Sequence, residues 1–297
     1  MHAHHHHASD DRGRLALAFA LIAGLLVAEL VVGIVAHSLA LLADAGHMLT
    51  DAAALALALI AAAVAGRPAR DSWTFGFRRI EVIAALTNGI TLVLVGIWIV
   101  FAAIRRLVAP PDVEGGLVLV VALAAIAVNV AAALLLARPS RRSLNVRGAF
   151  LHITTDLAAF TGTAIAGGLV LATGWDRFDP LASLAVAALI FWSAYVLLRD
   201  SARILMEAAP GDAAPAEVAE AMLTVPGVVE VHDLHVWTVG SDFPALSAHV
   251  LVAPGGDCHE ARRALAVMLA ERFDLRHTTL QVEHAARPLE SELPLVD

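Results

Sequence analysis

The stretch ADAGHMLTDA, residues 43–52, places two aspartates and a histidine inside an otherwise apolar run of leucine and alanine. That run covers residues 39–65, and about 20 apolar residues are enough to span a bilayer as a helix. Ionisable groups at bilayer depth are costly and mark a functional site by default. The stretch therefore predicts a functional polar site within a membrane-spanning helix, unless the segment lies at the membrane interface or in a soluble core.

The composition favours the membrane-spanning interpretation. The 297-residue chain is 59% hydrophobic and 16% charged, and its mean hydropathy is +0.75. All 20 of its Lys and Arg residues are arginines, so the sequence lacks the lysine that a P-loop needs to bind ATP. A net charge of −8 is the opposite of the positive charge that is typical of nucleic-acid-binding domains. The single cysteine, Cys258, excludes an internal disulfide and a four-thiolate metal site.

Six apolar stretches are long enough to cross a membrane, which predicts a six-helix transmembrane domain. They are residues 15–36, 39–65, 81–104, 116–137, 148–173 and 180–199. With the N-terminus inside, the inner segments hold twelve arginines and the outer segments hold three, Arg105, Arg106 and Arg177. The positive-inside rule then places both termini in the cytoplasm, as in a multi-pass protein of the cell inner (plasma) membrane.

The residues after the last span have the pattern of a small soluble α+β domain. Helical and strand-like segments follow one another there in the order αββαβ, with no apolar run long enough to span. We expect a His-rich tail at 1–14, a transmembrane domain at 15–207, a cytosolic domain at 208–288 and a C-terminal tail at 289–297. The histidines of the first tail fit either an expression tag or a native metal-attracting tail.

A His-x-x-x-Asp motif occurs twice, as His47 and Asp51 in the second span and as His152 and Asp156 in the fifth. Residues four apart lie on the same helical face. At ~1.5 Å per residue, the four side chains fall at overlapping depths in two antiparallel helices. Two imidazoles and two carboxylates suit four-coordinate Zn²⁺, with Cd²⁺, Co²⁺ or Ni²⁺ as other candidates. The sequence thus predicts one shared intramembrane metal site.

Such a site couples metal binding to proton release, because its ligands must lose their protons to bind. Free imidazole titrates near pH 6.5, where a proton gradient acts, so His47 and His152 are candidates for exchanging protons against zinc. Asp51 and Asp156 are then ligands that stay ionised with metal bound, although coupled groups titrate as a unit. We expect no enzyme, since a zinc hydrolase would need a motif such as HExxH and a vacant ligand position. A sensor that binds metal without moving it is the other alternative.

These features resemble the cation diffusion facilitator family, and within it the zinc-transporting branch. The resemblance covers residues 15–284 and is carried by the segments SLALLADAGHMLTDAAAL, TFGFRRIEVIAAL, HITTDLAA, GWDRFDPLASL and VHDLHVWTV. It implies a homodimer in which each protomer has six spans and a ferredoxin-like cytosolic domain. It also implies metal export by alternating access, coupled to inward proton flow.

The resemblance further suggests roles for polar residues outside the two motifs. Asp44 fits a partner of the metal ligands or a lining of the outward path, the alternative being a hydrated carboxylate at a helix end; Glu29 also lies within the first span. Arg79 is expected to pair with Glu207 and to interlock the membrane halves of the dimer, unless both are ordinary solvated charges. The loop after the second span holds Asp71 and no histidine, so the additional metal site of some relatives is not expected here.

By the same resemblance, four histidines match a regulatory zinc site at the dimer's cytosolic interface: His232, His249, His259 and, near the last ligand position, His284. Zinc bound there would draw the two cytosolic domains together and make the tail a sensor of cytosolic zinc. Surface histidines without a ligand are the alternative. Strand alternation places His232 and Asp233 on opposite faces, so they do not easily share one ion. Cys258 is either a soft ligand or an exposed thiol.

Overall fold

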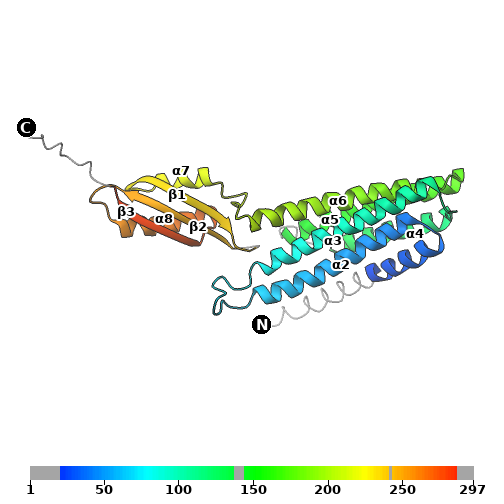
Figure 1. Cartoon of the computed structure of the whole chain (residues 1–297), viewed down its shortest axis with the longest axis horizontal. Helices are drawn as coiled ribbons and strands as arrows, with labels where there is room; N and C mark the ends of the chain where they lie inside the picture. Colours follow the sequence, from blue (N-terminus) through cyan, green and yellow to red (C-terminus); the bar gives the residue numbers. More distant parts are fainter. Residues whose placement is uncertain (1–20, 137–143, 241–242, 286–297) are drawn as a thin grey trace, which may run out of the picture. The chain divides into compact units, whose positions relative to one another are not determined.

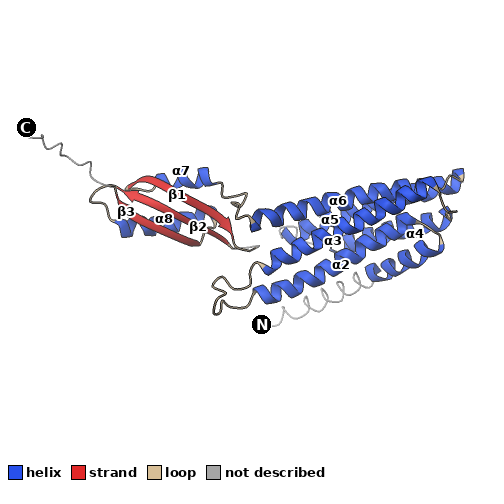
Figure 2. Ribbon diagram, viewed as in Figure 1, coloured by secondary structure: helices blue, strands red, loops and turns tan. Residues whose placement is uncertain are grey.

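The structure is a computed structural model of the chain, and it describes residues 21–136, 144–240 and 243–285. For residues 132–136 and 144–155, and for Leu55 and Leu59, only the backbone is described. The chain forms two compact units, Met1–Leu55 with Asn88–Val196 and Ala56–Thr87 with Leu197–Asp297. Figures 1 and 2 show long helices in one part of the chain and a small sheet with helices in the other.

The membrane part consists of long apolar helices. They are α2 (Leu39–Ala65), α3 (Ile80–Val108), α4 (Gly115–Leu136), α5 (Leu144–Thr173) and α6 (Phe178–Leu205), preceded by an N-terminal helix described over Leu21–Val35. Within the described residues, α2, α3, α6 and the Asp156–Thr173 segment of α5 are long and apolar enough to cross a membrane. Large apolar side chains such as Leu94, Phe101 and Trp192 are exposed on these helices, as expected of surfaces that face lipid.

Two helices extend beyond the apolar runs that predicted them. The runs at 81–104 and 180–199 end where arginines begin, but α3 continues through Arg105 and Arg106 to Val108, and α6 continues to Leu205. A helix ends where its backbone hydrogen bonds end, and polar residues can prolong it into the headgroup region. These helices are therefore longer than the apolar runs within them, and the start of the predicted 15–36 span lies outside the described residues.

The first turn of α2 is capped by two side chains. Ser38 occupies the N-cap position, and its Oγ accepts a hydrogen bond of 3.2 Å from the Leu41 amide. Asp179, at the start of α6, accepts bonds from the Leu39 amide at 2.7 Å and from the Ala40 amide at 3.2 Å. The Ser38 hydroxyl donates to the same carboxylate. The free amides at the start of α2 are therefore satisfied from another helix.

Arg106, near the end of α3, completes this contact. Its Nη1 lies 3.6 Å from Asp179 Oδ2 and donates to the carbonyl oxygen of His37. Asp179 is only 1% exposed, so its charge is shielded from solvent and balanced by the arginine and the helix amides. This Asp179 cluster (residues 38–40, Arg106 and Asp179) ties α2, α3 and α6 together at one end of the bundle.

Close backbone packing positions α5 against α4. A Cβ atom built on Gly167 would lie 2.8 Å from the Leu119 amide nitrogen, and one on Gly115 would lie 2.7 Å from the Gly167 carbonyl oxygen. Glycine at both positions is therefore what allows the two helices to approach this closely. Beside them, Leu25 of the N-terminal helix packs with residues of α2, α4 and α5 in one buried cluster.

The C-terminal domain contains α7 (Pro215–Leu223), β1 (Val228–Thr238), β2 (Pro244–Val252), α8 (Cys258–Phe273) and β3 (His277–His284) in that order. β2 is the central strand; it runs antiparallel to β1 and parallel to β3, with α8 in the connection to β3. Its core is apolar and combines both helices with the sheet: Val218, Met222, Val236, Leu246, Val250, Leu265 and Leu269. The domain is thus built around a small buried core of its own.

Strand β1 departs from strict alternation. Its register with β2 shifts between His232 and His235, and Asp233 within that interval has a positive φ of 51°. The expected opposite faces of His232 and Asp233 assume regular alternation, which this bulge interrupts. Asp233 Oδ1 instead lies 3.0 Å from Nε2 of His235.

Candidate metal centre

His47 lies between two carboxylates that belong to different helices. Its Nε2 is 3.6 Å from Oδ2 of Asp51, one turn further along α2, and 4.0 Å from Oδ1 of Asp156 on α5. Two ligands at about 2.0–2.1 Å from a tetrahedral zinc ion lie roughly 3.3 Å apart, so each pair would have to close by less than about 1 Å. The side chains of His47, Asp51 and Asp156 are 14%, 27% and 15% exposed, which leaves the site accessible to a small ion.

His152, the fourth predicted ligand, lies in the backbone of α5, but its side chain is outside the described residues. Among the side chains that the structure describes, no group of three or more His, Cys, Asp or Glu residues is arranged closely enough to hold a metal ion. The structure thus brings three of the four predicted residues near one another, and the complete ligand set stays a prediction.

A second polar level lies about two helical turns away from the first. Asp44, seven residues before Asp51, is 3% exposed, and its Oδ2 accepts a 2.9 Å bond from the hydroxyl of Thr163, seven residues after Asp156. At ~1.5 Å per residue the two levels of this antiparallel helix pair are about 10 Å apart. Asp44 is therefore buried between helices rather than hydrated at a helix end.

Glu29 of the N-terminal helix is fully buried at 0% exposure. Neither of its carboxylate oxygens has a hydrogen-bond partner among the described residues. It interacts electrostatically with Asp44 and Asp156, which carry the same charge when ionised. The polar interior of the bundle thus holds more carboxylates than the two His-x-x-x-Asp motifs supply.

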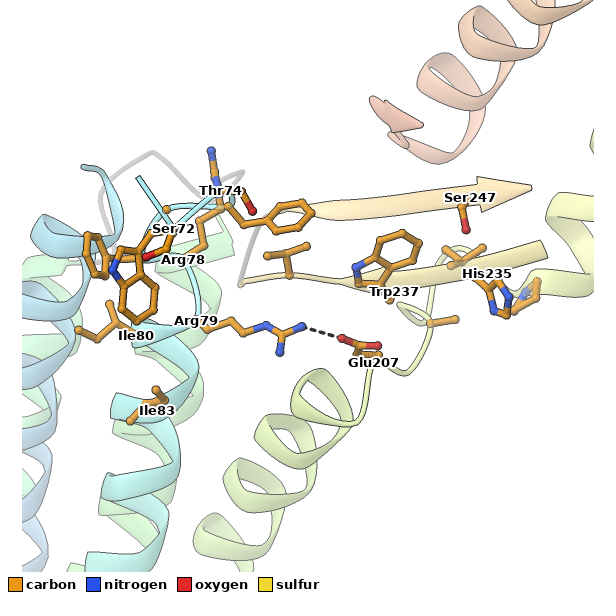
Figure 3. A pocket seen from close by; sticks show the side chains of 18 of the residues that line it. Ser72, Thr74, Arg78, Arg79, Ile80, Ile83, Glu207, His235, Trp237 and Ser247 are labelled. Atoms are coloured by element: carbon orange, nitrogen blue, oxygen red, sulfur yellow. Dashed lines mark hydrogen bonds and ion pairs between the residues drawn. The ribbon is translucent and has the colours of Figure 1, made fainter. Parts of the chain in front are cut away.

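Arg79 and Glu207 form an ion pair within one chain, as Figure 3 shows. Arg79 Nη2, just before α3, lies 2.8 Å from Glu207 Oε1, just after α6, and the two side chains are 44% and 60% exposed. The pair lines a cavity of about 1030 Å³ whose wall includes Trp237 and His235 of β1. Among the described side chains of the His-x-x-x-Asp motifs, those of His47, Asp51 and Asp156 do not line this cavity. The role of the pair in a dimer stays a prediction.

Three of the four predicted regulatory histidines make pairwise contacts in the C-terminal domain. His232 on β1 and His249 on β2 face each other across the sheet, with ring centroids 5.4 Å apart. His284, at the end of β3, has both ring nitrogens 3.6 Å from the Cys258 sulfur at the start of α8. Within the described residues these groups do not form one cluster of three or more ligands. The structure thus brings His232 near His249 and Cys258 near His284, and the regulatory zinc site at the dimer interface stays a prediction.

The start of α8, which carries Cys258 and His259, is fixed by a capping aspartate. Asp257 Oδ1 accepts hydrogen bonds from the backbone amides of His259, at 2.8 Å, and Glu260, at 3.0 Å. The bonds from the Glu260 and His259 amides lower the pKa of Asp257 below its usual range, because they stabilise the ionised form. Asp257 therefore orients the first turn of the helix without itself being a predicted ligand.

Sequence reasoning missed Ser38, Asp179 and Thr163. Ser38 and Asp179 carried usable signals, since serine precedes the apolar run of α2 and an Asp-Pro pair opens α6. Their contact could not be predicted, because they are 141 residues apart in the chain. Thr163 gave no signal, since a lone threonine in an apolar helix is common and its partner lies 119 residues away.

Comparison with known families covers nearly the whole chain. The family described as the cation efflux transmembrane domain matches residues 15–206, and the cytoplasmic domain of cation efflux proteins matches residues 210–285. The chain belongs to the cation efflux family, and within it to the zinc-transporter branch, as the resemblance in its motifs predicted. Membership of this family indicates a transporter rather than an enzyme.

Several relatives align over most of their length. The zinc transporter ZitB of Escherichia coli (strain K12) is 40% identical over 290 residues, which cover 95% of this chain and 92% of ZitB. The metal cation efflux system protein CzcD of Cupriavidus metallidurans is 38% identical over 286 residues, covering 96% and 90%. A cadmium, cobalt and zinc/H(+)-K(+) antiporter of Bacillus velezensis is 35% identical over 289 residues, covering 96% and 92%.

One solved structure is also similar in sequence. It is the metal-bound C-terminal domain of the CzcD transporter from Cupriavidus metallidurans, which is 38% identical. The match covers 23% of this chain and 94% of that chain, with a TM-score of 0.22.

Proposed function

We propose that this protein is a proton-coupled antiporter that exports Zn²⁺ from the cytoplasm by alternating access, with Cd²⁺, Co²⁺ and Ni²⁺ as further candidate substrates. The observation that carries the proposal is the position of His47 between Asp51 and Asp156, on two antiparallel helices. Nitrogen and oxygen donors at these distances suit a borderline ion such as zinc. The relatives named for zinc, cobalt and cadmium transport support the same substrate class.

In this proposal His152 completes the site as the fourth ligand, and protons are exchanged at the two histidines. A metal-free imidazole binds a proton on the acidic side of the membrane, and zinc displaces it on the other side. The carboxylates of Asp51 and Asp156 supply negative charge that balances the positive charge of the zinc ion. The name of the Bacillus velezensis relative, a cadmium, cobalt and zinc/H(+)-K(+) antiporter, supports proton coupling in this chain.

The proposed architecture is a homodimer with six spans in each protomer and both termini in the cytoplasm. It comprises a tail at 1–14, a transmembrane domain at 15–207, a ferredoxin-like domain at 208–288 and a tail at 289–297. The family ranges 15–206 and 210–285 support these boundaries, and the second family is named for dimerisation. The match to a cation efflux transmembrane domain and the arginine distribution support a multi-pass protein with cytoplasmic termini, and we place it in the cell inner membrane.

A regulatory zinc site in the cytosolic domain forms part of the proposal. It uses His232, His249, His259 and His284, and the two ligand pairs in one protomer leave coordination positions for the partner protomer. Zinc bound across the interface would stabilise the state in which the cytosolic domains of the two protomers are drawn together. Isothermal titration of zinc into the whole protein, with and without His232→Ala, checks this assignment.

Zinc-65 flux into everted membrane vesicles tests the transport proposal. Asp51→Ala and Asp156→Ala should each lower the flux by at least about 100-fold, since each removes a direct ligand and even outer partners cost 10–100-fold. Asp112→Ala, at an exposed loop position, is the matched control and should transport as wild type does. The variants should remain folded and dimeric by size-exclusion chromatography.

Two results would contradict the proposal. One is normal flux in both aspartate variants, which would place the ion elsewhere. The other is zinc binding by the wild type without any flux into proteoliposomes under an imposed pH gradient, which would indicate a sensor.

A further inference from the structure

Glu29 and Asp44 lie at the same depth in two adjoining helices. Glu29 is six residues before the end of the Leu21–Val35 helix, and Asp44 is five residues after the start of α2. At ~1.5 Å per residue these offsets correspond to about 9 Å and about 8 Å from the reversal that joins the helices. The two carboxylates, called the acid pair below, therefore occupy one level, some 10 Å from the level of Asp51 and Asp156.

Among the described residues, no arginine interacts electrostatically with either member of the acid pair. Glu29 is the one ionisable group of its own helix between residues 21 and 35, and α4, which packs against it, has none. From α2 it faces Asp44, with His47 and Asp51 further along that helix. On α5, Asp156 interacts electrostatically with Glu29. The other ionisable residues of that helix are Arg147 and His152, and their side chains are not among those that the structure describes.

The two members of the acid pair are satisfied differently. Asp44 accepts the hydroxyl proton of Thr163, whereas both oxygens of Glu29 lack a hydrogen-bond partner among the described residues. A carboxylate that is buried without a partner is stable only when it is neutral or when a cation balances it. Oxygen ligands alone do not favour zinc, which prefers nitrogen and sulfur. A proton is therefore the cation that fits this level.

We propose that the acid pair of Glu29 and Asp44 is a proton-binding station of the transporter, separate from the four zinc ligands. The proposal rests on the proposed function as an antiporter. No hydrogen bond links Glu29 to a metal ligand in the described structure, so its proton is not held by the zinc site itself. The station responds to zinc through space, because the added positive charge of the ion favours the ionised acid pair.

The proton cycle balances as follows. In the zinc-free state Glu29 carries a proton and is neutral. When zinc binds from the cytoplasm, the O–H bond of Glu29 breaks and the proton passes to water on that side. When zinc leaves on the other side, a proton from water there forms the O–H bond again. One zinc ion thus moves outward while the station carries one proton inward, in addition to protons carried by the histidines.

The test uses the whole protein in proteoliposomes and measures zinc-65 together with a pH-sensitive dye. Two rates are compared for wild type, Glu29→Gln and the control Glu114→Gln, an exposed glutamate of the same unit. The first rate is zinc–zinc exchange without a pH gradient, and the second is zinc flux driven by a pH gradient. We expect Glu29→Gln to retain zinc–zinc exchange. The factor by which the pH gradient accelerates zinc flux should fall about tenfold relative to wild type, which is within the usual 5–150-fold range of coupling between sites. Fewer protons should also move per zinc ion.

Each alternative outcome has a distinct meaning. If wild type shows no gradient-driven flux, the proposed antiport fails. If wild type does and Glu29→Gln keeps the same proton-to-zinc ratio, the antiport stands and the proton station is overturned. If Glu29→Gln instead binds one zinc ion fewer by equilibrium dialysis, the acid pair is a metal site and the inference is again overturned.

A second variant covers the case in which Glu29→Gln does not fold. Glu29→Asp keeps a titratable carboxyl but moves it, so coupling should persist with a shifted pH midpoint of zinc flux. An unchanged midpoint, or a loss of coupling as complete as in Glu29→Gln, would overturn the proposal. The Glu114→Gln control should keep both the midpoint and the proton-to-zinc ratio of wild type.

Discussion

Thr163 donates the hydrogen bond that satisfies the buried carboxylate of Asp44. Valine has nearly the same shape as threonine but has no hydroxyl, so Thr163→Val leaves this carboxylate oxygen without its donor. The free energy of unfolding should fall by about 1–3 kcal/mol, the usual cost of an unsatisfied buried polar group. Chemical denaturation in detergent, followed by tryptophan fluorescence, measures the change.

Thr161→Val is the matched control for this substitution. Thr161 is two residues away on α5 and is exposed, and its hydroxyl donates to the carbonyl oxygen of Leu157 in its own helix. Its free energy of unfolding should change by no more than about 0.5 kcal/mol. Equal losses in the two variants would show that the Asp44 bond contributes nothing specific.

Individual site residues were predictable from the sequence where spacing alone set their geometry. A histidine and an aspartate four apart share a helical face in any helix, so the two motifs could be recognised without coordinates. The approach of His47 to Asp156 needed the additional assumption that the helices are antiparallel neighbours. The burial of Glu29 could not be predicted, because a single acid in an apolar run gives no indication of what packs around it.

At the level of elements, the start of α2 depends on Asp179, which belongs to α6. Asp179→Asn removes the charge that faces Arg106 and weakens the bonds to the Leu39 and Ala40 amides. We expect a loss of about 2 kcal/mol in the free energy of unfolding, typical of hydrogen bonds to a charged group. Zinc affinity should also fall, by 10–100-fold as for other supporting residues, because α2 carries His47 and Asp51.

Denaturant titration and equilibrium dialysis with zinc measure these two effects. Asp112→Asn, at an exposed position between α3 and α4, is the control and should match wild type in both. If Asp179→Asn has the same free energy of unfolding and the same zinc affinity as wild type, the Asp179 cluster does not determine where α2 begins.

The start of α8 has a pH dependence that follows from Asp257. The pKa of this carboxyl is lowered in the folded protein, so its capping bonds contribute fully above the ordinary value of 3.8. The contribution is lost as the pH falls below that value through the folded pKa. Asp257→Ala should therefore reduce the protection of the first α8 amides against hydrogen exchange at neutral pH.

The same comparison at a pH well below 3.8 should show a smaller difference, because protonation of the wild-type carboxyl then weakens its capping bonds. Hydrogen-exchange mass spectrometry of the whole protein, corrected for intrinsic rates, gives both values. A difference between Asp257→Ala and wild type that grows on acidification would contradict the capping role.

Element bounds were predictable only as far as hydropathy follows the helix. The apolar runs placed each membrane helix, but α6 continues through Arg199 and Arg203, whose long side chains keep their charge in the headgroup region while the backbone stays helical. The bulge in β1 at Asp233 escaped prediction for a related reason. Local alternation does not reveal where a neighbouring strand forces an extra residue.

For the molecule as a whole, the Arg79–Glu207 pair offers a test of the expected interlock. Both side chains are substantially exposed, so breaking the pair should change the free energy of unfolding by less than about 1 kcal/mol. Arg79→Glu and Glu207→Arg each place like charges together and should reduce zinc transport. The double variant, which restores opposite charges, should recover it.

Zinc-65 flux and unfolding midpoints of the three variants, each compared with wild type, separate the two effects. Loss of transport in the single variants without rescue in the double variant would mean that one residue acts independently of the other. Unchanged transport in all three would leave the pair as ordinary surface charges.

The order of the domains was accessible from the sequence because composition changes sharply near residue 208. A helical membrane part followed by a cytosolic domain with a small sheet agrees with the two family matches. The pairing of the domain's histidines was not accessible, since it depends on the register in which His232 meets His249.

The bonds of Asp179 to α2 and Arg106 have a mechanical consequence for any transport cycle. Because α2, α3 and α6 are joined at one end, that end acts as a common pivot about which the three helices can tilt. The larger displacements then occur at the opposite ends of these helices. Pairs of spin labels placed there should give a broader distribution of distances than pairs placed beside the Asp179 cluster. Asp179→Asn should loosen this pivot and make the two spreads more alike.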